Sequence, residues 1–349
     1  MPIPGQNVKD LWESEVRLHG ENATQSFTDK CGKLIQDGDL RYEDFSIKEV
    51  FESVSRTAFP TITGELILKP AMIDAYKAVP AIGNQLVTKY PSKRKQENIP
   101  GLTAIEFPEE VKESQRYPHT GVDEKYVLVK NHKYGRIIDV TEEAVMEDAT
   151  GQLLMRIRNI GDAAARFREK VILYTIQDNA SYYAYYPAGT RTALYQRTGA
   201  YYSLYETNTL AEWTDVDNAR GYLALHTDDN GEPILVSANT LLVPEKLATT
   251  AAYIVTNTKD TRGTYNADAP PTNYKSLSSA FLDALSTSDW YFGDFKKQFA
   301  LTDVWPLQVM QQKADASDDA FDRDIYAKFK VRMYFGCGAR DYRYVCKST

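Results

Sequence analysis

An apolar stripe along residues 153–174 constrains the fold of this chain more than any other sequence feature. Thr141 is a candidate N-cap upstream of it, because Glu142 and Glu143 follow in the first turn, where the helix dipole favours anions. Gly151 divides the helical region into a short helix and a long one, whose rise of about 1.5 Å per residue gives a spine of roughly 35 Å. The stripe recurs at steps of three or four, as one face of an α-helix does, at Leu153, Ile157, Ile160, Ala164, Phe167, Val171 and Tyr174.

The C-terminal part of the sequence predicts β-strands. After Trp290 and its aromatic neighbours come four alternating or β-rich runs, at 298–304, 307–311, 324–335 and 342–346. An acidic turn separates the second run from the third, and no catalytic signature interrupts any of them. These strands indicate a surface rather than a reaction centre, and together with the long helix they predict an α+β fold.

The N-terminal part predicts an arm and a connection. Residues 1–60 show no sustained period, so we expect an extended arm with short helices, one of them at 47–54, rather than a core domain. A further helix is expected from about Ala71, with Pro70 in its first turn. A loop over 91–102 then leads out of this region.

Strand-like runs follow at 103–107, 125–131 and 136–140, with a Lys-Tyr-Gly turn before the last. They predict a long β-excursion over 103–140 that has few residues free to make its own core. Because an isolated β-ribbon is marginal in water, we expect this excursion to rest on a neighbouring chain.

Residues 182–205 hold eight of the 24 tyrosines. Their rings can pack on the protein's surface or on a neighbour, or they can form a platform that stacks carbohydrate or bases. We favour packing, because a stacking site for single-stranded nucleic acid also needs a basic groove, and this stretch offers only Arg191 and Arg197. Further on, the sequence predicts apolar strands at 233–236 and 239–244 and a helix at 245–256.

Charge and composition exclude several classes of protein. A formal charge of −7 argues against binding nucleic acid over the whole surface, which requires Lys and Arg to displace phosphate counterions. The sequence has no apolar run long enough for a membrane span and begins without a signal-peptide pattern, so secretion is not expected. Cys31, Cys337 and Cys346 form no Cys-x-x-Cys pair, which favours reduced thiols.

No motif for catalysis, cofactor binding or metal binding emerges. The sequence lacks His-Glu-x-x-His, Gly-x-Ser-x-Gly and the phosphate-binding Gly-rich loop. The acidic turn at 228–231 lacks the bidentate Glu of a calcium loop, and Cys337 has no cationic cluster beside it to activate the thiol. We therefore assign no catalytic, cofactor-binding or metal-ligating residue; the four histidines are scattered, at His19, His119, His132 and His226.

Four stretches in a fixed order resemble a known family. They are the β-return at 126–140, the Thr-Glu-Glu opening and long helix at 141–177, a segment at 231–247 that contains Leu242-Val243-Pro244, and the closing strands at 293–347. In this order they resemble the major capsid proteins of tailed double-stranded-DNA bacteriophages, whose fold was first described in the Hong Kong ninety-seven phage. The Leu-Val-Pro segment is similar to the Mu-like branch of major head subunits.

The resemblance implies a phage major capsid fold and a division of the chain. That division is an N-terminal arm at 1–60, an arm-to-core connection with a helix at 61–102, an extended β-hairpin loop at 103–140, the peripheral-domain spine helix at 141–180, an axial domain at 181–318 and peripheral-domain closing strands at 319–349. The family's prototype joins subunits through a Lys–Asn bond. Lys130, Asn131 and Lys133 lie in the matching loop, but no partner or catalytic acid can be placed beside them, so we do not carry that chemistry over.

The resemblance also implies partners. Copies of the chain would self-assemble as hexamers and pentamers into an icosahedral head around double-stranded DNA, without sequence-specific binding and without a membrane. A portal and a decoration or cement protein are expected, and a separate scaffolding protein too, because residues 1–60 are too few for the prototype's scaffolding segment. The expected location is the virion capsid, assembled in the cytoplasm of a host bacterium.

Two other functions remain open at the level of sequence. A cellular encapsulin-like nanocompartment would use the same fold to enclose protein cargo. An unrecognised α+β enzyme, for example one that acts on glycans through residues 182–205, would belong to a different class. The absence of a catalytic signature favours a structural shell protein that is not an enzyme.

Overall fold

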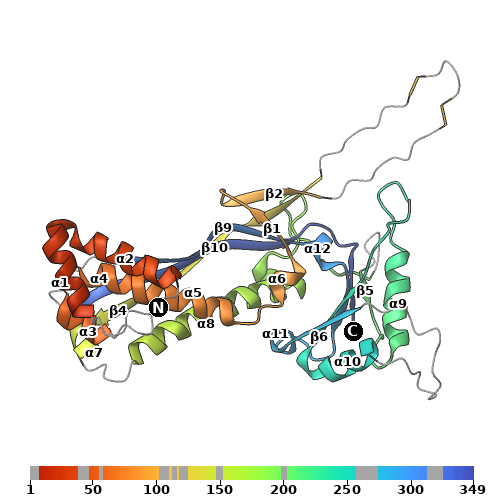
Figure 1. Ribbon diagram of the computed structural model, residues 1–349. Coiled ribbons are helices and arrows are strands. Elements are labelled where there is room, and N and C mark those ends of the chain that lie inside the picture. Colours follow the sequence, from red (N-terminus) through yellow and green to blue (C-terminus); the bar gives the residue numbers. More distant parts are fainter. Residues whose placement is uncertain are drawn as a thin grey trace. The chain divides into compact units, whose positions relative to one another are not determined.

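The predicted spine helix and closing strands correspond to the longest helix and the two longest strands among the described residues. In the computed structural model these are helix α8 (Gln152–Ile176) and strands β9 (Phe299–Gln312) and β10 (Ile325–Ala339) (Figure 1). Each contributes residues to two units: the first comprises Met1–Pro80, Lys133–Phe167 and Trp305–Tyr334, and the second comprises the remainder. The structure describes residues 8–37, 47–54, 58–101, 110–111, 116–117, 125–146, 152–197, 203–256, 274–312 and 325–349.

The N-terminal helices supply core side chains to the first unit. Phe27 and Phe59 are fully buried, and the Trp12 ring meets Phe27 edge to face with 5.5 Å between centroids. The short helices expected in this part of the chain therefore also contribute to a core, which the sequence did not indicate because short helices separated by turns show no sustained apolar period. The helices are α1 (Val8–His19), η1 (Gly20–Asn22), α2 (Ala23–Asp37), α3 (Ile47–Ser53), α4 (Phe59–Ile62), the π-helical turn η3 (Thr63–Leu68) and α5 (Lys69–Ala78).

Two of the helices that the sequence predicted in this region are confirmed. Helix α3 covers the predicted helix at 47–54, and Pro70 lies at the start of α5. Proline suits the first turn of a helix because the N–H that it lacks would have no intrahelical partner there.

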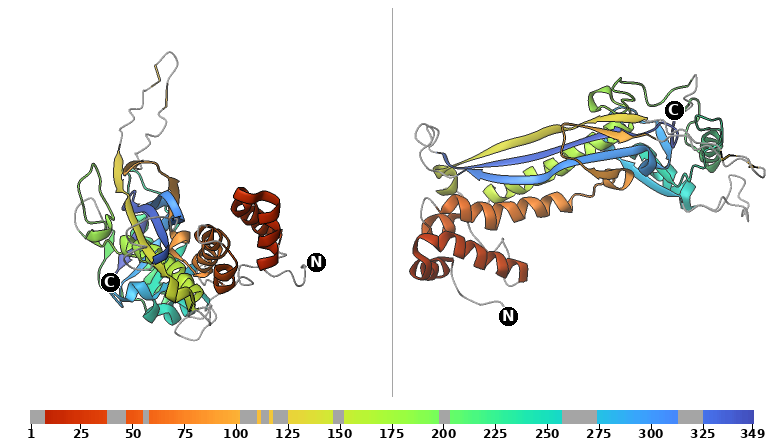
Figure 2. Two further views of the ribbon diagram at one scale, coloured as in Figure 1. Left: turned by 90° about the vertical axis from the view of Figure 1, so that its left-hand side faces the viewer. Right: turned by 90° about the horizontal axis from the view of Figure 1, so that it is seen from above.

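A four-stranded sheet has the order β1-β9-β10-β4, where β1 is Thr88–Pro91 and β4 is His132–Thr141. Strand β1 belongs to the second unit, and the first unit takes its strands from β4, β9 and β10. Figure 2 shows β9 and β10 side by side along their length. On β10, Ala327, Phe329 and Val331 are buried in one cluster with residues of α5 and α8. Since side chains alternate across a strand, the residues between these three lie on the opposite face of the sheet.

The division of the helical region into two helices is confirmed. Thr141 Oγ1 accepts a hydrogen bond from Ala144 N at 3.3 Å, as expected of an N-cap, and α7 (Glu142–Met146) ends before α8 begins. Gly151, the predicted dividing residue, lies outside the described residues.

The predicted apolar stripe of α8 is confirmed at Ile157 and Val171, which are buried, but it does not hold along the whole helix. Phe167 and Tyr174 are only half-buried, whereas the charged residues Arg168 and Glu169 are buried. Arg168 donates to Asp303 at 2.7 Å, and Glu169 accepts twice from Gly83 N, at 2.8 and 3.0 Å, where α6 (Gly83–Leu86) begins. Sequence periodicity treats charged residues as exposed, and these two are buried because each has a partner in the second unit.

The second unit contains a five-stranded sheet in the order β5-β11-β8-β6-β7. Strand β6 (Thr240–Pro244) and the helices η5 (Glu245–Leu247) and α10 (Ala248–Thr256) confirm the predictions for 239–256. The strand predicted at 233–236 is wrong, because its described backbone makes only an isolated bridge between Thr227 and Pro233. The other strands are β5 (Leu204–Tyr205), β7 (Lys275–Ser279), β8 (Trp290–Gly293) and β11 (Val345–Ser348).

Short helices complete the second unit. They are η4 (Ala180–Tyr182), α9 (Trp213–Ala224), α11 (Ala280–Asp283) and α12 (Phe295–Gln298), none of which was predicted as a helix from the sequence. Gly293, between β8 and α12, has a φ of +156°, and a Cβ there would collide with the carbonyl oxygen of Tyr344. Glycine therefore permits the close pairing of β8 with β11. No described helix has the length and apolar character needed to cross a membrane.

Candidate assembly surfaces

The described residues gather no group of three His, Cys, Asp or Glu side chains suited to a metal ion. Cys31, Cys337 and Cys346 are buried and unbridged, and burial raises the pKa of Cys337 and of Cys346 to about 12. Such thiols stay protonated near neutral pH and are poor nucleophiles. Burial also lowers the pKa of His226, while His119 lies outside the described residues.

A two-stranded ribbon forms the root of the segment 102–124. Strand β2 (Gln96–Pro100) pairs antiparallel with β3 (Tyr126–Lys130), and Gly101 N donates to Lys125 O at 2.9 Å. The two ends of the segment are thus held side by side. The loop predicted over 91–102 is wrong at β2, a polar strand that owes its place to pairing with β3; the strand predicted at 103–107 lies outside the described residues.

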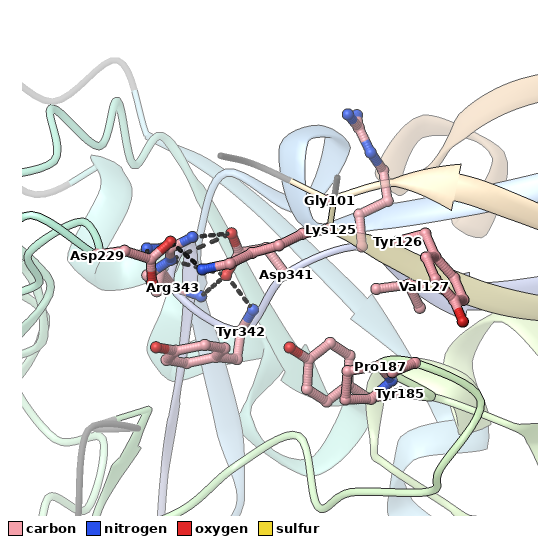
Figure 3. A pocket seen from close by; sticks show the side chains of 12 residues that line it. Gly101, Lys125, Tyr126, Val127, Tyr185, Pro187, Asp229, Asp341, Tyr342 and Arg343 are labelled. Atoms are coloured by element: carbon pink, nitrogen blue, oxygen red, sulfur yellow. Dashed lines mark hydrogen bonds and ion pairs between the residues drawn. The ribbon is translucent and has the colours of Figure 1, made fainter. Parts of the chain in front are cut away.

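Four charged groups lie beside this root. Lys125 Nζ lies 2.5 Å from Asp229 Oδ2, and Arg343 Nη1 lies 3.8 Å from Asp229 Oδ1. Arg343 also binds Asp341 through two nitrogens, Nε at 3.0 Å and Nη2 at 2.8 Å. Figure 3 shows this charge network, which links the root to the turn at 228–231 and to the segment before β11. Its charges balance within the second unit.

A pocket of about 310 Å³ opens next to the charge network. Figure 3 shows the rings of Tyr126, Tyr185 and Tyr342 on its wall. Arg340 also lines it, and its guanidinium lies 5.6 Å from the Tyr90 ring centroid. The lining includes tyrosine and arginine, two residue types that are enriched at protein–protein contacts.

The residues considered for a Lys–Asn bond are occupied by structural contacts. Lys130 Nζ lies 4.8 and 4.7 Å from the ring centroids of Tyr183 and Tyr186. Buried Asn131 donates to Ser92 Oγ and to Arg94 O, and it accepts a hydrogen bond from Thr302 Oγ1. These contacts fix the end of β3 on its neighbours.

The tyrosine-rich stretch packs within the second unit. Tyr195 meets buried Tyr291 with 5.6 Å between ring centroids, and Tyr205 stacks on Tyr222 at 5.1 Å. Arg191 pairs with Asp178 at 3.0 Å. These contacts favour the packing interpretation for the described tyrosines.

Positive side chains gather on the outer face of the first unit's sheet. The Trp305 ring has Arg332 Cζ at 4.3 Å and Lys133 Nζ at 5.1 Å from its centroid. Lys328 and Lys330 alternate with the buried residues of β10 and therefore share this face. We call Lys133, Trp305, Lys328, Lys330 and Arg332 the basic sheet face.

A comparison with family models identifies the family of this chain. The model of the phage capsid protein family matches residues 125–348, more than half of the chain. The chain belongs to the phage capsid protein family. As a capsid protein it is a structural component of the virion, and its copies assemble into capsid oligomers.

Solved structures agree on the fold. The capsid protein is similar to structures from Microbacterium phage Oxtober96 (12% identity, TM-score 0.52, covering 78% of this chain and 91% of that one) and Mycobacterium phage Adephagia (17%, 0.51, 78% and 92%). Mycobacterium phage Bobi gives 14% identity, a TM-score of 0.51 and coverage of 78% and 90%. These likenesses confirm the α+β phage capsid fold of the Hong Kong ninety-seven type. A comparison with curated proteins finds no match.

Sequence reasoning missed both charged features of the capsid protein. The charge network joins residues from three distant segments, at Lys125, Asp229 and 341–343, and no local motif marks it. The basic sheet face could have been found, because lysine and arginine alternate with apolar residues along 327–333. That alternation predicts one buried and one cationic face.

Proposed function

We propose that this capsid protein forms the hexamers and pentamers of the icosahedral head of a tailed bacteriophage, enclosing double-stranded DNA. Assembly takes place in the cytoplasm of the host bacterium, with a separate scaffolding protein, a portal and a decoration or cement protein. The DNA is packaged without sequence-specific binding. Family membership and fold support a shell of this type.

The domain assignment is part of the proposal. We assign 1–60 to the arm, 61–102 to its connection with the core, 103–140 to the extended loop, 141–180 to the spine helix, 181–318 to the axial domain and 319–349 to the closing strands. The long elements α8, β9 and β10 support a rigid centre for such a subunit.

The two-stranded ribbon at the root of 102–124 is the structural feature that best supports a role in assembly. Its two strands share a small apolar cluster of Ile99, Val129 and Ala300, with Tyr90 packed against it. A two-stranded ribbon is marginal in water unless more structure packs on it. A subunit that carries such a root gains stability when the segment beyond it lies on another copy.

Replacing residues 102–124 with a short Gly-Ser linker tests this role. The Gly101–Lys125 hydrogen bond holds the two ends together, so a short linker can close them without disturbing β2 and β3. We expect a folded subunit, with its wild-type melting temperature by circular dichroism, that forms no closed shells by electron microscopy. Normal shells from this variant would contradict the proposal.

The contents of native particles distinguish the head from the alternative nanocompartment. Nuclease-protected double-stranded DNA inside purified shells supports a phage head. Shells that hold protein cargo and no nucleic acid would instead indicate an encapsulin-like compartment. A wild-type chain that stays a discrete monomer when it is expressed with a scaffolding protein would contradict both.

A further inference from the structure

His226 is a titratable residue buried in the second unit. Only 5% of it is exposed, and neither ring nitrogen has a hydrogen-bond partner among the residues that the structure describes. Buried polar atoms normally have such partners. The interior therefore accepts a neutral imidazole at this position, whereas protonation would place a positive charge where water does not reach it.

A hairpin connects His226 to the charge network. His226 O accepts a hydrogen bond from Ile234 N at 3.0 Å, which closes the base of the hairpin. The turn at its tip carries Asp229, whose Oδ2 lies 2.5 Å from Lys125 Nζ at the root of the ribbon (Figure 3). We call residues 226–234 the His226 hairpin. Because only two residues separate His226 from Asp229, a movement at the base of the hairpin also displaces its tip.

Groups of both signs act on the His226 ring. Burial lowers the pKa of His226 below 6.5, its ordinary value. Asp341 and the Leu223 carbonyl favour the protonated ring, and Arg343 opposes it, without reversing the effect of burial. Tyr222 of α9 meets the ring edge to face, with 6.1 Å between centroids. The hairpin itself carries three carboxylates, at Asp228, Asp229 and Glu232.

Asp341 has no free position for a protonated His226. Its Oδ1 accepts from Tyr342 N at 2.6 Å and from Arg343 N and Nε at 3.1 and 3.0 Å. Its Oδ2 accepts from Arg343 Nη2 at 2.8 Å. A carboxylate offers about four lone-pair sites, so a new donor has to displace one of these. An imidazolium at position 226 must therefore take the place of Arg343 or move out to water.

We propose that His226 is a proton sensor that couples mild acid to the opening of the His226 hairpin and to the loosening of the ribbon root. Near neutral pH the neutral ring packs on Tyr222, and the hairpin holds Asp229 at Lys125. When the ring is protonated, it displaces Arg343 or leaves the interior. Either movement opens the base of the hairpin and withdraws Asp229 from Lys125. The device acts within one subunit and does not depend on the proposed assembly.

The pH range follows from the coupling between protonation and folding. A histidine whose folded pKa is lowered contributes stability that is present above pH 6.5, its value in an unfolded chain. That stability is lost as pH falls through the folded pKa. The hairpin should therefore be closed at about pH 7.5 and should begin to open below pH 6.5, before ordinary carboxylates with a pKa of about 4 are protonated.

Amide hydrogen exchange of the unassembled full-length subunit tests the proposal. NMR resolves single amides, and division by the intrinsic exchange rate at each pH gives their protection. Protection of the Ile234 N–H should fall about tenfold between about pH 7.5 and about pH 5, because the opening equilibrium gains up to tenfold for each pH unit below 6.5. Protection of the Gly101 N–H, which donates to Lys125 O in the root, should fall only about two- to fivefold, since a half-exposed ion pair stabilises little.

Variants without the proton site should abolish the loss. His226→Phe keeps a ring against Tyr222 but cannot be protonated, so the protection of Ile234 should no longer change between the two pH values. His19→Phe is the matched control, because this histidine is 48% exposed and lies in the first unit. It should show the wild-type loss.

Folding of the variants is checked by circular dichroism. If His226→Phe does not fold, the smaller and uncharged His226→Gln replaces it with the same expected result. The wild-type chain with isotope-labelled histidine gives a test that needs no substitution. The midpoint of the His226 ring titration should coincide with the midpoint of the loss of protection at Ile234, and separate midpoints would contradict the proposal.

A second histidine near the ribbon needs its own variant. His132, at the start of β4, stacks on Tyr183 with 4.8 Å between ring centroids. Burial lowers the pKa of His132, and the charges of Lys130 and Lys95 lower it further. His132→Phe keeps a ring in the stack, and it should retain the acid-induced loss of protection at Ile234.

Asp229→Asn tests the coupling between the hairpin and the root. Ile234 should still lose protection in acid, because His226 is intact. Gly101 should no longer respond to pH, because the charged tip that bound Lys125 is gone.

Four results would overturn the proposal. Unchanged protection of Ile234 in the wild type would show that the hairpin does not respond to acid. An equal loss in a folded His226 variant would assign the response to carboxylates. Abolition of the loss by His132→Phe would place the sensor at that residue. A response of Gly101 that persists in Asp229→Asn would show that the root is not coupled to the hairpin.

Discussion

Arginine has a carboxylate partner in the charge network of the second unit but none among the described residues at the basic sheet face of the first. Arg343 is 7% exposed and is bound by Asp341 and Asp229 of its own unit. Arg332 lies over a tryptophan and makes no ion pair with a described carboxylate. A charge whose counterion lies in the same unit stabilises the fold, whereas a charge without one is available for assembly. Substitutions should therefore affect folding at the first site and association at the second.

The largest effect on the free energy of unfolding is expected from substitution of Arg343. Its removal leaves the Asp341 carboxylate, which is 3% exposed, buried without its cation. Arg343→Met should lower the free energy of unfolding by about 3–5 kcal/mol, as measured by urea denaturation of the unassembled subunit. Adding Asp341→Asn should recover most of that loss, because the buried charge is then gone. A loss below about 1 kcal/mol would show that the network is a surface feature.

Glu169 of α8 offers a smaller effect that depends on pH. Burial raises the pKa of its carboxyl group above the usual 4.5, despite the Gly83 N–H bonds. A raised folded-state pKa means that the contribution of this group is fully present below pH 4.5 and is lost as pH rises through the folded pKa. The melting temperature of Glu169→Gln should therefore increase relative to that of the wild type as the pH rises from 4.5 to 7. A constant difference between the two proteins would contradict the raised pKa.

The smallest effect on folding is expected at Lys330. It is exposed and has no carboxylate partner among the described residues, so Lys330→Ala should change the free energy of unfolding by less than about 0.5 kcal/mol. The same variant should raise the subunit concentration needed for shell assembly, as light scattering would show. A change in the free energy of unfolding without a change in shell assembly would show that Lys330 contributes to folding rather than to association.

Long, regular elements could be predicted from the sequence, and features held by distant partners could not. The spine helix and the closing strands were recognisable because each repeats its period over several residues, and the strand at 239–244 because it is a short, continuous apolar run. The burial of Arg168 and Glu169 depends on Asp303 and Gly83, which lie far away in the chain. Strand β2 depends in the same way on β3. The fold class could be predicted because periodicity is a property of neighbouring residues. The charge network could not be predicted, because its ion pairs join residues that are far apart in the sequence.

The hydrogen bond between Gly101 and Lys125 has a consequence for evolution. Because the chain leaves and re-enters the ribbon at adjacent points, the length and composition of the intervening segment can drift without altering the fold beneath it. The segment then behaves as an exchangeable cassette. Substitutions within this segment of about two dozen residues can therefore change the specificity of subunit contacts, while the rest of the subunit evolves separately.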